Sequence, residues 1–91
     1  MLTLKQQAVS IAFGTVSFFM ADDNRTVRVD VSQDLLARID GPPASKSGYV
    51  ERLMRHQRQF AQIAAAKYDE GQYEAEVQVL VVRIEAHDLI D

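Results

Sequence analysis

The sequence predicts an α+β fold of two layers, in which a small antiparallel or mixed sheet packs on one long and one short helix. Alternating apolar residues near both ends of the chain indicate strands. Apolar residues at three- and four-residue steps between positions 47 and 69 indicate a long amphipathic helix. The chain has 91 residues, of which 47% are hydrophobic and 25% charged. This size and composition are typical of one folded domain, spanning residues 1–91.

An N-terminal hairpin is the first predicted element of the sheet. Apolar residues alternate over residues 8–13 and again, one residue out of phase, over residues 15–21. The phase changes at Gly14, which indicates a bulge or a tight bend. Residues 22–25 read Asp-Asp-Asn-Arg, a turn sequence. Three valines in residues 27–31 then alternate with polar residues, so this segment is expected to pair with residues 15–21.

A short helix is predicted after the hairpin. The Ser32 hydroxyl can cap free backbone N–H groups, and Asp34 suits the positive end of a helix. Gly41 and the two prolines after it end the helix. Its buried stripe is expected to be Leu35, Leu36 and Ile39.

A long helix is predicted from a cap at Ser47 to about Asp69, with Gly71 closing it. At 1.5 Å per residue it would be roughly 33 Å long, enough to cross a small sheet. Its expected buried stripe is Val50, Leu53, Met54, Phe60, Ile63, Ala64 and Tyr68.

Residues 75–84 are predicted to form the last strand, with apolar side chains on both faces. Such a pattern favours a strand that is covered on both sides. One cover is the long helix, and the other is the short helix or a second subunit. We therefore expect a homodimer, because a two-fold contact lets one apolar patch cover its own copy.

Composition excludes several classes of protein. The chain has no cysteine, which excludes disulfides, thiolate zinc sites and cysteine nucleophiles and agrees with a cytoplasmic location. No signal-peptide pattern is present, and no apolar run is longer than four residues, the length of Val79 to Val82, which is too short to span a membrane. Net charge is −3, but residues 51–68 carry +3 and residues 69–91 carry −6. This asymmetry could steer one molecule onto another, or the two segments could neutralise each other within the fold.

The candidate ligand-binding residues are Arg52, Arg55, His56 and Arg58 on the long helix. A positive helical face can bind phosphates or an acidic partner, but the sequence favours a solvated outer face on which Glu51 and Arg55 pair at i, i+4. Binding of nucleic acid is disfavoured, because no aromatic side chain interleaves for base stacking and the net charge is negative.

Catalytic and metal-binding motifs are absent from the sequence. His56 and His87 are the only histidines, and neither lies in a metal-ligand spacing, although Glu85 or Asp88 could pair with His87. No nucleophile motif or glycine-rich phosphate loop occurs. We expect no cofactor, no metal and no catalytic residue, and the sequence leans away from an enzyme without deciding the matter.

The order of the predicted elements and several short motifs resemble a bacterial protein family. The motifs are Val31-Ser32-x-x-Leu35-Leu36, then Arg58, Ile63-Ala64, Lys67-Tyr68 and Gly71, and finally Ala86-His87-Asp88-Leu89. Over residues 15–90 the chain resembles the short proteins classed as domain of unknown function fourteen-eighty-eight. The resemblance implies a two-layer α+β fold in a cytoplasmic bacterial protein, and it implies no activity. From the missing catalytic motifs, the small size and the two-sided last strand we expect a non-enzymatic interaction or regulatory module, with binding of nucleic acid or a phosphate ligand as the alternative.

Overall fold

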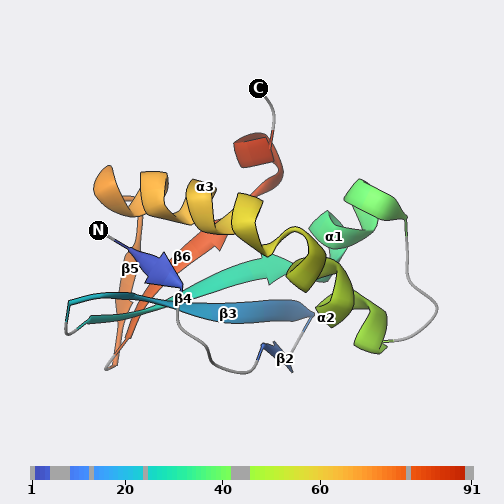
Figure 1. Ribbon diagram of the computed structural model, residues 1–91, viewed down its shortest axis with the longest axis horizontal. Helices are drawn as coiled ribbons and strands as arrows, with labels where there is room; N and C mark the ends of the chain where they lie inside the picture. The colour runs from blue at the N-terminus through green and yellow to red at the C-terminus, as the bar shows by residue number, and fades with distance from the viewer. Residues whose placement is uncertain are drawn as a thin grey trace.

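The computed structural model is α+β, with one mixed sheet and three α-helices (Figure 1). It describes residues 2–4, 9–12, 14–23, 25–41, 46–77 and 79–89. The strands are β1 (Thr3–Leu4), β2 (Ser10–Ala12), β3 (Thr15–Asp22), β4 (Arg25–Ser32), β5 (Glu74–Glu76) and β6 (Val79–Ile84). The helices are α1 (Gln33–Asp40), α2 (Lys46–Arg55), α3 (Gln57–Asp69) and a short 3₁₀ turn, η1 (Ala86–Leu89).

The strand order is β1-β3-β4-β6-β5, with β2 also paired to β3. The predicted hairpin of β3 and β4 is present, and it pairs Thr15 with Ser32 at one end and Asp22 with Arg25 at the other. β6 runs parallel to β4, whereas every other pair is antiparallel. The parallel pair makes the sheet mixed, and the helices provide the crossover connection that parallel strands need.

Gly14 joins β2 to β3 with a φ of 77°, a conformation that favours glycine. The phase change read from the sequence is this tight turn, and the carbonyl of Gly14 accepts a hydrogen bond of 2.9 Å from the Gln33 N–H. The predicted strand over residues 8–13 is shorter here, since β2 spans three residues. Phe13 and Asn24 lie outside the described residues.

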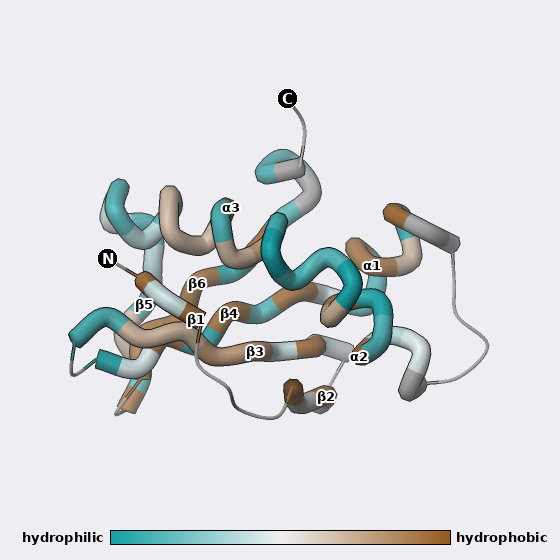
Figure 2. Tube along the Cα trace, in the orientation of Figure 1, coloured by the Kyte–Doolittle hydropathy of each residue, from teal (hydrophilic) through white to brown (hydrophobic). Residues whose placement is uncertain are grey.

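One face of the sheet, the covered face, is apolar and carries the helices. On β3, β4 and β6 the pairing aligns Phe18 with Val29 and Val29 with Val82, and all three side chains are fully buried. Leu36, Leu53 and other apolar side chains from α1, α2 and α3 complete the same core cluster. Figure 2 shows hydrophobic residues concentrated on these strands and hydrophilic ones along the outer side of α2 and the start of α3.

The other face, the open face, differs from the expectation that both sides are covered. Among the described residues no helix lies on it, and charged side chains form contacts across it. Arg28 pairs with Asp30 at 2.8 Å and with Glu76 at 3.4 Å, and Arg83 pairs with Glu74 at 3.2 Å. Val81 nevertheless is only 1% exposed. Long side chains can cover apolar surface with their stems, so this face needs no further element to bury Val81.

The predicted strand over residues 75–84 is wrong in one respect: it is a hairpin of β5 and β6. Val77 lies at the turn with 89% of its surface exposed, so it belongs to neither face. β5 pairs Glu74 with Val81 and Glu76 with Val79. The alternation of valines did not reveal the turn, because Val77 itself occupies a turn position.

The predicted long helix is also wrong as a single element, because His56 divides it into α2 and α3. His56 has φ −104° and ψ 11°, outside the helical range. Its N–H is shared between the carbonyls of Arg52 and Leu53, at 3.1 and 3.2 Å. The bend lets α2 pack beside α1 and β3 while α3 packs on β6 and β1. One straight helix could not follow both directions.

The short helix agrees with its prediction at the N-terminus. The Ser32 hydroxyl accepts a hydrogen bond of 3.0 Å from the Leu35 N–H, and Gly41 ends α1 with a φ of 82°.

Three details of the predicted helices are corrected. Ile39 and Met54 are exposed rather than buried, and Ser47 lies inside α2 rather than before it.

Candidate interaction surface

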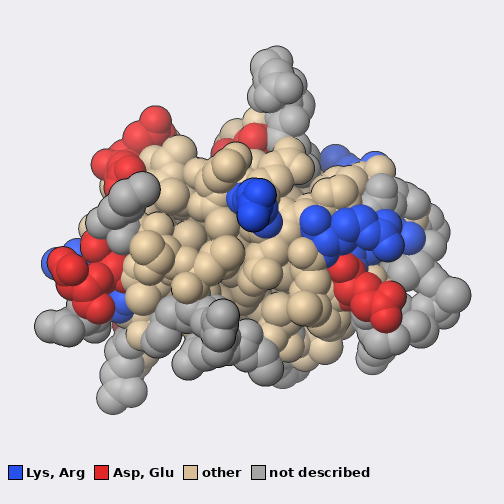
Figure 3. Space-filling view, in the orientation of Figure 1, with Lys and Arg blue, Asp and Glu red and all other residues tan. Residues whose placement is uncertain are grey.

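The outer side of α3 is the longest uninterrupted helical surface that the described residues leave uncovered. Phe60, Ala61, Ala64 and Tyr68 face the sheet and are buried. The opposite side carries the exposed residues Arg58, Gln59, Gln62, Ala66 and Asp69, which we call the α3 outer face. Figure 3 shows basic side chains over α2 and the start of α3 with an acidic one directly beside them, further acidic ones beyond the end of α3, and uncharged surface along α3 between them.

The charges on the α3 outer face run against the helix dipole. Arg58 lies in the first turn and Asp69 is the last residue, and the first turn holds no acidic residue. The dipole favours the opposite order, by about 0.3–1 kcal/mol for each charge. Lys67 in the last turn has the favourable sign. The positions of Arg58 and Asp69 are therefore not explained by the stability of α3 itself.

The four predicted ligand-binding residues lie around the bend between α2 and α3. Arg55 and Arg58 are exposed, whereas Arg52 and His56 are half-buried. The His56 ring contacts Phe60 edge-on, with 6.4 Å between ring centroids. Nη1 of Arg52 is buried and has no hydrogen-bond partner among the described residues.

The bend changes which residues share a face. The sequence places Arg52, Arg55, Gln59 and Gln62 on one face of a continuous helix. In the structure the first two belong to α2 and the last two to α3, so that face is interrupted at His56. The stripe that remains continuous is Arg58, Gln62 and Asp69 within α3. The spacing of these three residues is present in the sequence, but the prediction of one uninterrupted helix favoured the face that carries Arg52 and Arg55.

The acidic tail is neutralised mainly by residues outside α2 and the start of α3. Glu74 pairs with Arg83, and Glu76 pairs with Arg28. Asp88 pairs with Lys67 of segment 51–68. Neither Arg52 nor Arg58 forms an ion pair with a described residue of the tail. Within the described part of the tail, therefore, no carboxylate accounts for these two arginines.

The contact between Lys67 and Asp88 fixes the C-terminal turn to α3. The two side chains are 12% and 11% exposed, and Nζ lies 2.8 Å from Oδ2. Nζ also donates to the Arg83 carbonyl at 2.6 Å, and Oδ2 accepts from the Glu85 N–H at 2.8 Å. Burial alone raises the pKa of Asp88, but the hydrogen bonds from Lys67 and Glu85 outweigh it and hold that pKa below its ordinary value.

His87 lies beside both carboxylates that the sequence offered as its partners. Nδ1 is 3.3 Å from Glu85 and Nε2 is 3.4 Å from Asp88. The ring is 69% exposed, and Asp88 is already held by Lys67. Over the parts of the chain that the structure describes, no group of three side chains suited to a metal ion occurs.

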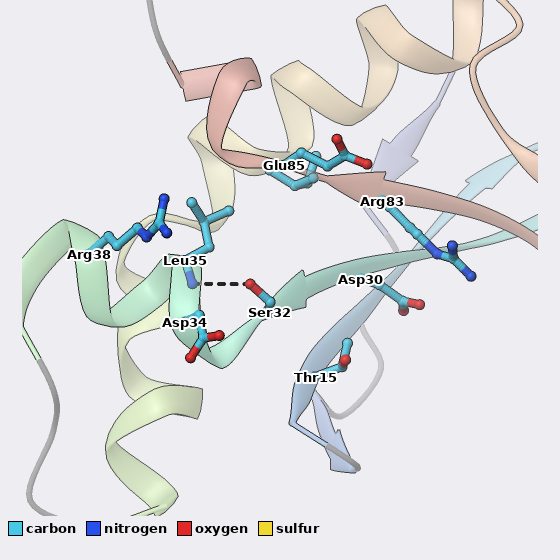
Figure 4. A pocket seen from close by; sticks show the side chains of 9 residues that line it. Thr15, Asp30, Ser32, Asp34, Leu35, Arg38, Arg83 and Glu85 are labelled. Atoms are coloured by element: carbon cyan, nitrogen blue, oxygen red, sulfur yellow. Dashed lines mark hydrogen bonds between the residues drawn. The ribbon is translucent and has the colours of Figure 1, made fainter.

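A pocket of about 490 Å³, which sequence reasoning missed, opens at the carboxyl ends of the parallel strands β4 and β6 (Figure 4). Asp34 and Arg38 of α1 line one side, and Arg83 and Glu85 the other. These four charges cancel, and Asp30 at the rim is held by Ser17 at 2.7 Å and by Arg28. Ser32, the cap of α1, is also part of the wall. The pocket lining therefore carries charges of both signs.

Tyr68 ties the end of α3 to the β3–β4 hairpin. Its hydroxyl donates to Asp22 at 2.9 Å and accepts from Arg25 at 3.4 Å, and its ring stacks on Tyr73 with 5.1 Å between centroids. These contacts fix the acidic end of α3 against the sheet.

No helix within the described residues combines the length and the apolar character needed to cross a membrane.

Comparisons of this chain with family models, with curated proteins and with solved structures gave no significant match. The family resemblance noted from the residues stays a prediction.

Proposed function

We propose that this protein is a non-enzymatic interaction module, and that its working surface is the basic region around the bend between α2 and α3. The partner is an acidic surface on a protein. The observation that carries the proposal is the position of Arg58, which lies exposed in the first turn of α3 where the helix dipole disfavours a positive charge.

Several features of the surface support protein binding. Arg55 and Arg58 are exposed on neighbouring helical segments, and Met54 beside them is 58% exposed. Arginine and methionine are both enriched in protein interfaces.

A labelled poly-L-glutamate peptide tests the proposal by fluorescence anisotropy at low salt. We expect binding by the unmodified chain and a loss of about tenfold or more in the double variant Arg55→Gln/Arg58→Gln, because two charge contacts are removed. The matched control is Arg38→Gln/Arg83→Gln, which removes the same charge elsewhere and should retain binding. Equal losses in both variants would show that net charge, rather than this surface, governs binding, and would overturn the proposal.

The second candidate function is binding of nucleic acid or a phosphate-bearing ligand through Arg52, Arg55, His56 and Arg58. The observation in its favour is that Arg55 and Arg58 are both exposed beside the bend, where their guanidinium groups can reach phosphate oxygens. Binding of single- and double-stranded oligonucleotides at rising salt tests it, because each neutralised phosphate steepens the loss of affinity. Tighter binding of an oligonucleotide than of poly-L-glutamate would favour this candidate. We expect the reverse.

A further inference from the structure

We propose that the acidic partner is a second copy of this chain, and that two copies pack their α3 outer faces antiparallel. The inference rests on the proposed function, because it names the partner of Arg58, the residue that the basic region and the α3 outer face share. It is carried by the order of charges along α3, basic at the start and acidic at the end.

The residues concerned lie on one narrow stripe. At about 100° per residue, Arg58, Gln62 and Asp69 fall within an arc of about 40°, with Ala66 at its margin. All four are exposed. The stripe thus has a positive end, a negative end and an uncharged middle, and the two charged positions are separated by about 16 Å along the axis.

An antiparallel pair makes this stripe complementary to itself. When the two-fold axis passes near residues 63 and 64, Arg58 of one copy lies opposite Asp69 of the other. The same register sets Gln62 opposite Ala65 and one residue from Ala66, and both alanines are small enough to let the two helices approach. A parallel pair would instead place Arg58 against Arg58 and Asp69 against Asp69. The charge order therefore selects the antiparallel arrangement.

The same arrangement offsets the unfavourable dipole of α3. In each copy the first turn, which carries Arg58, would gain the Asp69 carboxylate of the second copy close to its positive end. The last turn would likewise gain an arginine. Arg58 and Asp69 are unfavourably placed for the dipole of their own helix, but each is favourably placed for the dipole of the second copy's helix.

Closure and size set the expected strength. A two-fold contact uses the same patch twice and closes at two chains, so each dimer contains two Arg58–Asp69 contacts. One helix face is smaller than the roughly 800 Å² per partner of a standard interface. We therefore expect weak association at micromolar concentrations that falls with salt.

Sedimentation velocity of the full chain from 5 to 200 μM, in low and in high salt, provides the test. We expect the mass to rise from the monomer value of 10.2 kDa toward the dimer in low salt. Arg58→Glu and Asp69→Arg should each lower the association constant about tenfold or more, because each places like charges opposite one another. A mixture of the two single variants should associate again, because in the mixed dimer an acidic side chain faces a basic one at both contacts.

The controls separate this proposal from the more general one. Arg83→Glu on the open face should leave association unchanged, and circular dichroism should show that every variant is folded. A chain that stays at 10.2 kDa up to 200 μM overturns the dimer, even if it still binds poly-L-glutamate through Arg55 and Arg58. Persistent dimers in both single variants, or a mixture that fails to associate, also overturn it. Loss of poly-L-glutamate binding alone would overturn only the proposed function of the surface toward other proteins.

Discussion

The two faces of the sheet bury side chains in different ways. On the covered face, Phe18 and Val82 pack into a core that helices complete. On the open face, Val81 is buried to the same degree with no helix above it among the described residues, in the company of Arg28, Arg83 and Glu74. The comparison teaches that apolar residues on both sides of a strand do not require a second packed layer.

The largest expected effect separates two neighbouring phenylalanines on β3. Phe18 is fully buried on the covered face, whereas Phe19 is half-buried on the open face. Phe18→Ala should lower the free energy of unfolding by about 3–5 kcal/mol, because the helices cannot fill the cavity. Phe19→Ala should cost about 1 kcal/mol, in line with partial burial. Urea unfolding measures both, and equal losses would remove the distinction between the faces.

Two adjacent valines on β6 sharpen the comparison, since both are buried. Val82→Ala on the covered face should cost about 2–3 kcal/mol, whereas Val81→Ala on the open face should cost about 1 kcal/mol. The difference follows from the covers, because flexible arginine and glutamate side chains can move into the space that Val81 leaves. A Val81→Ala loss as large as that of Val82→Ala would mean that the open face is packed rigidly.

Asp88 tests a charged contact on the helical side. Asp88→Asn should cost about 1–3 kcal/mol, because it leaves the half-buried Lys67 without its ionic partner. The folded-state pKa of Asp88 lies below its ordinary value of 3.8, so its contribution is present above that pH and is lost as the pH falls through the folded pKa. Between pH 5 and 2 the free energy of unfolding of the unmodified chain should therefore fall more than that of Asp88→Asn, because only the unmodified chain loses this carboxylate's contribution. Parallel pH profiles would contradict the assignment.

The smallest effect is expected on the open face. Arg83 and Glu74 are 55% and 59% exposed, so solvent screens their attraction. Glu74→Gln should change the free energy of unfolding by no more than about 0.5 kcal/mol. Chemical unfolding of Glu74→Gln and of Asp88→Asn under the same conditions compares the free-energy contributions of an exposed and a half-buried ion pair. A loss as large as that of Asp88→Asn would show that the charges on the open face act together as a network.

Much of the fold could be predicted because local signals were unambiguous. The valines of β4, the Ser32 cap and Gly14 each specify a backbone state through one residue type or a period of two. The α+β class follows from them. The division at His56 could not be predicted, because histidine is an ordinary helical residue and the bend follows from packing against two different sets of strands.

The candidate surface could be predicted only in part. The sequence located Arg52, Arg55, His56 and Arg58, since a run of arginines is visible without a structure. It missed Asp69 as the counterpart of Arg58, although their eleven-residue spacing puts both on one face of a helix, because the interpretation of this segment rested on its basic residues alone. The pocket beside α1 was missed for a similar reason: its walls come from three separate strands and a helix.

The lysine that holds the C-terminal turn also has a consequence for the solubility of the chain. β5 pairs with β6 only from Val79 to Val81, so the outer edge of residues 82–84 extends beyond it. A bare strand edge invites another chain to add a strand and start an aggregate. Lys67 occupies the Arg83 carbonyl on β6 and brings a positive charge to the strand. This contact thereby disfavours strand-to-strand association of this valine-rich chain at the edge of β6.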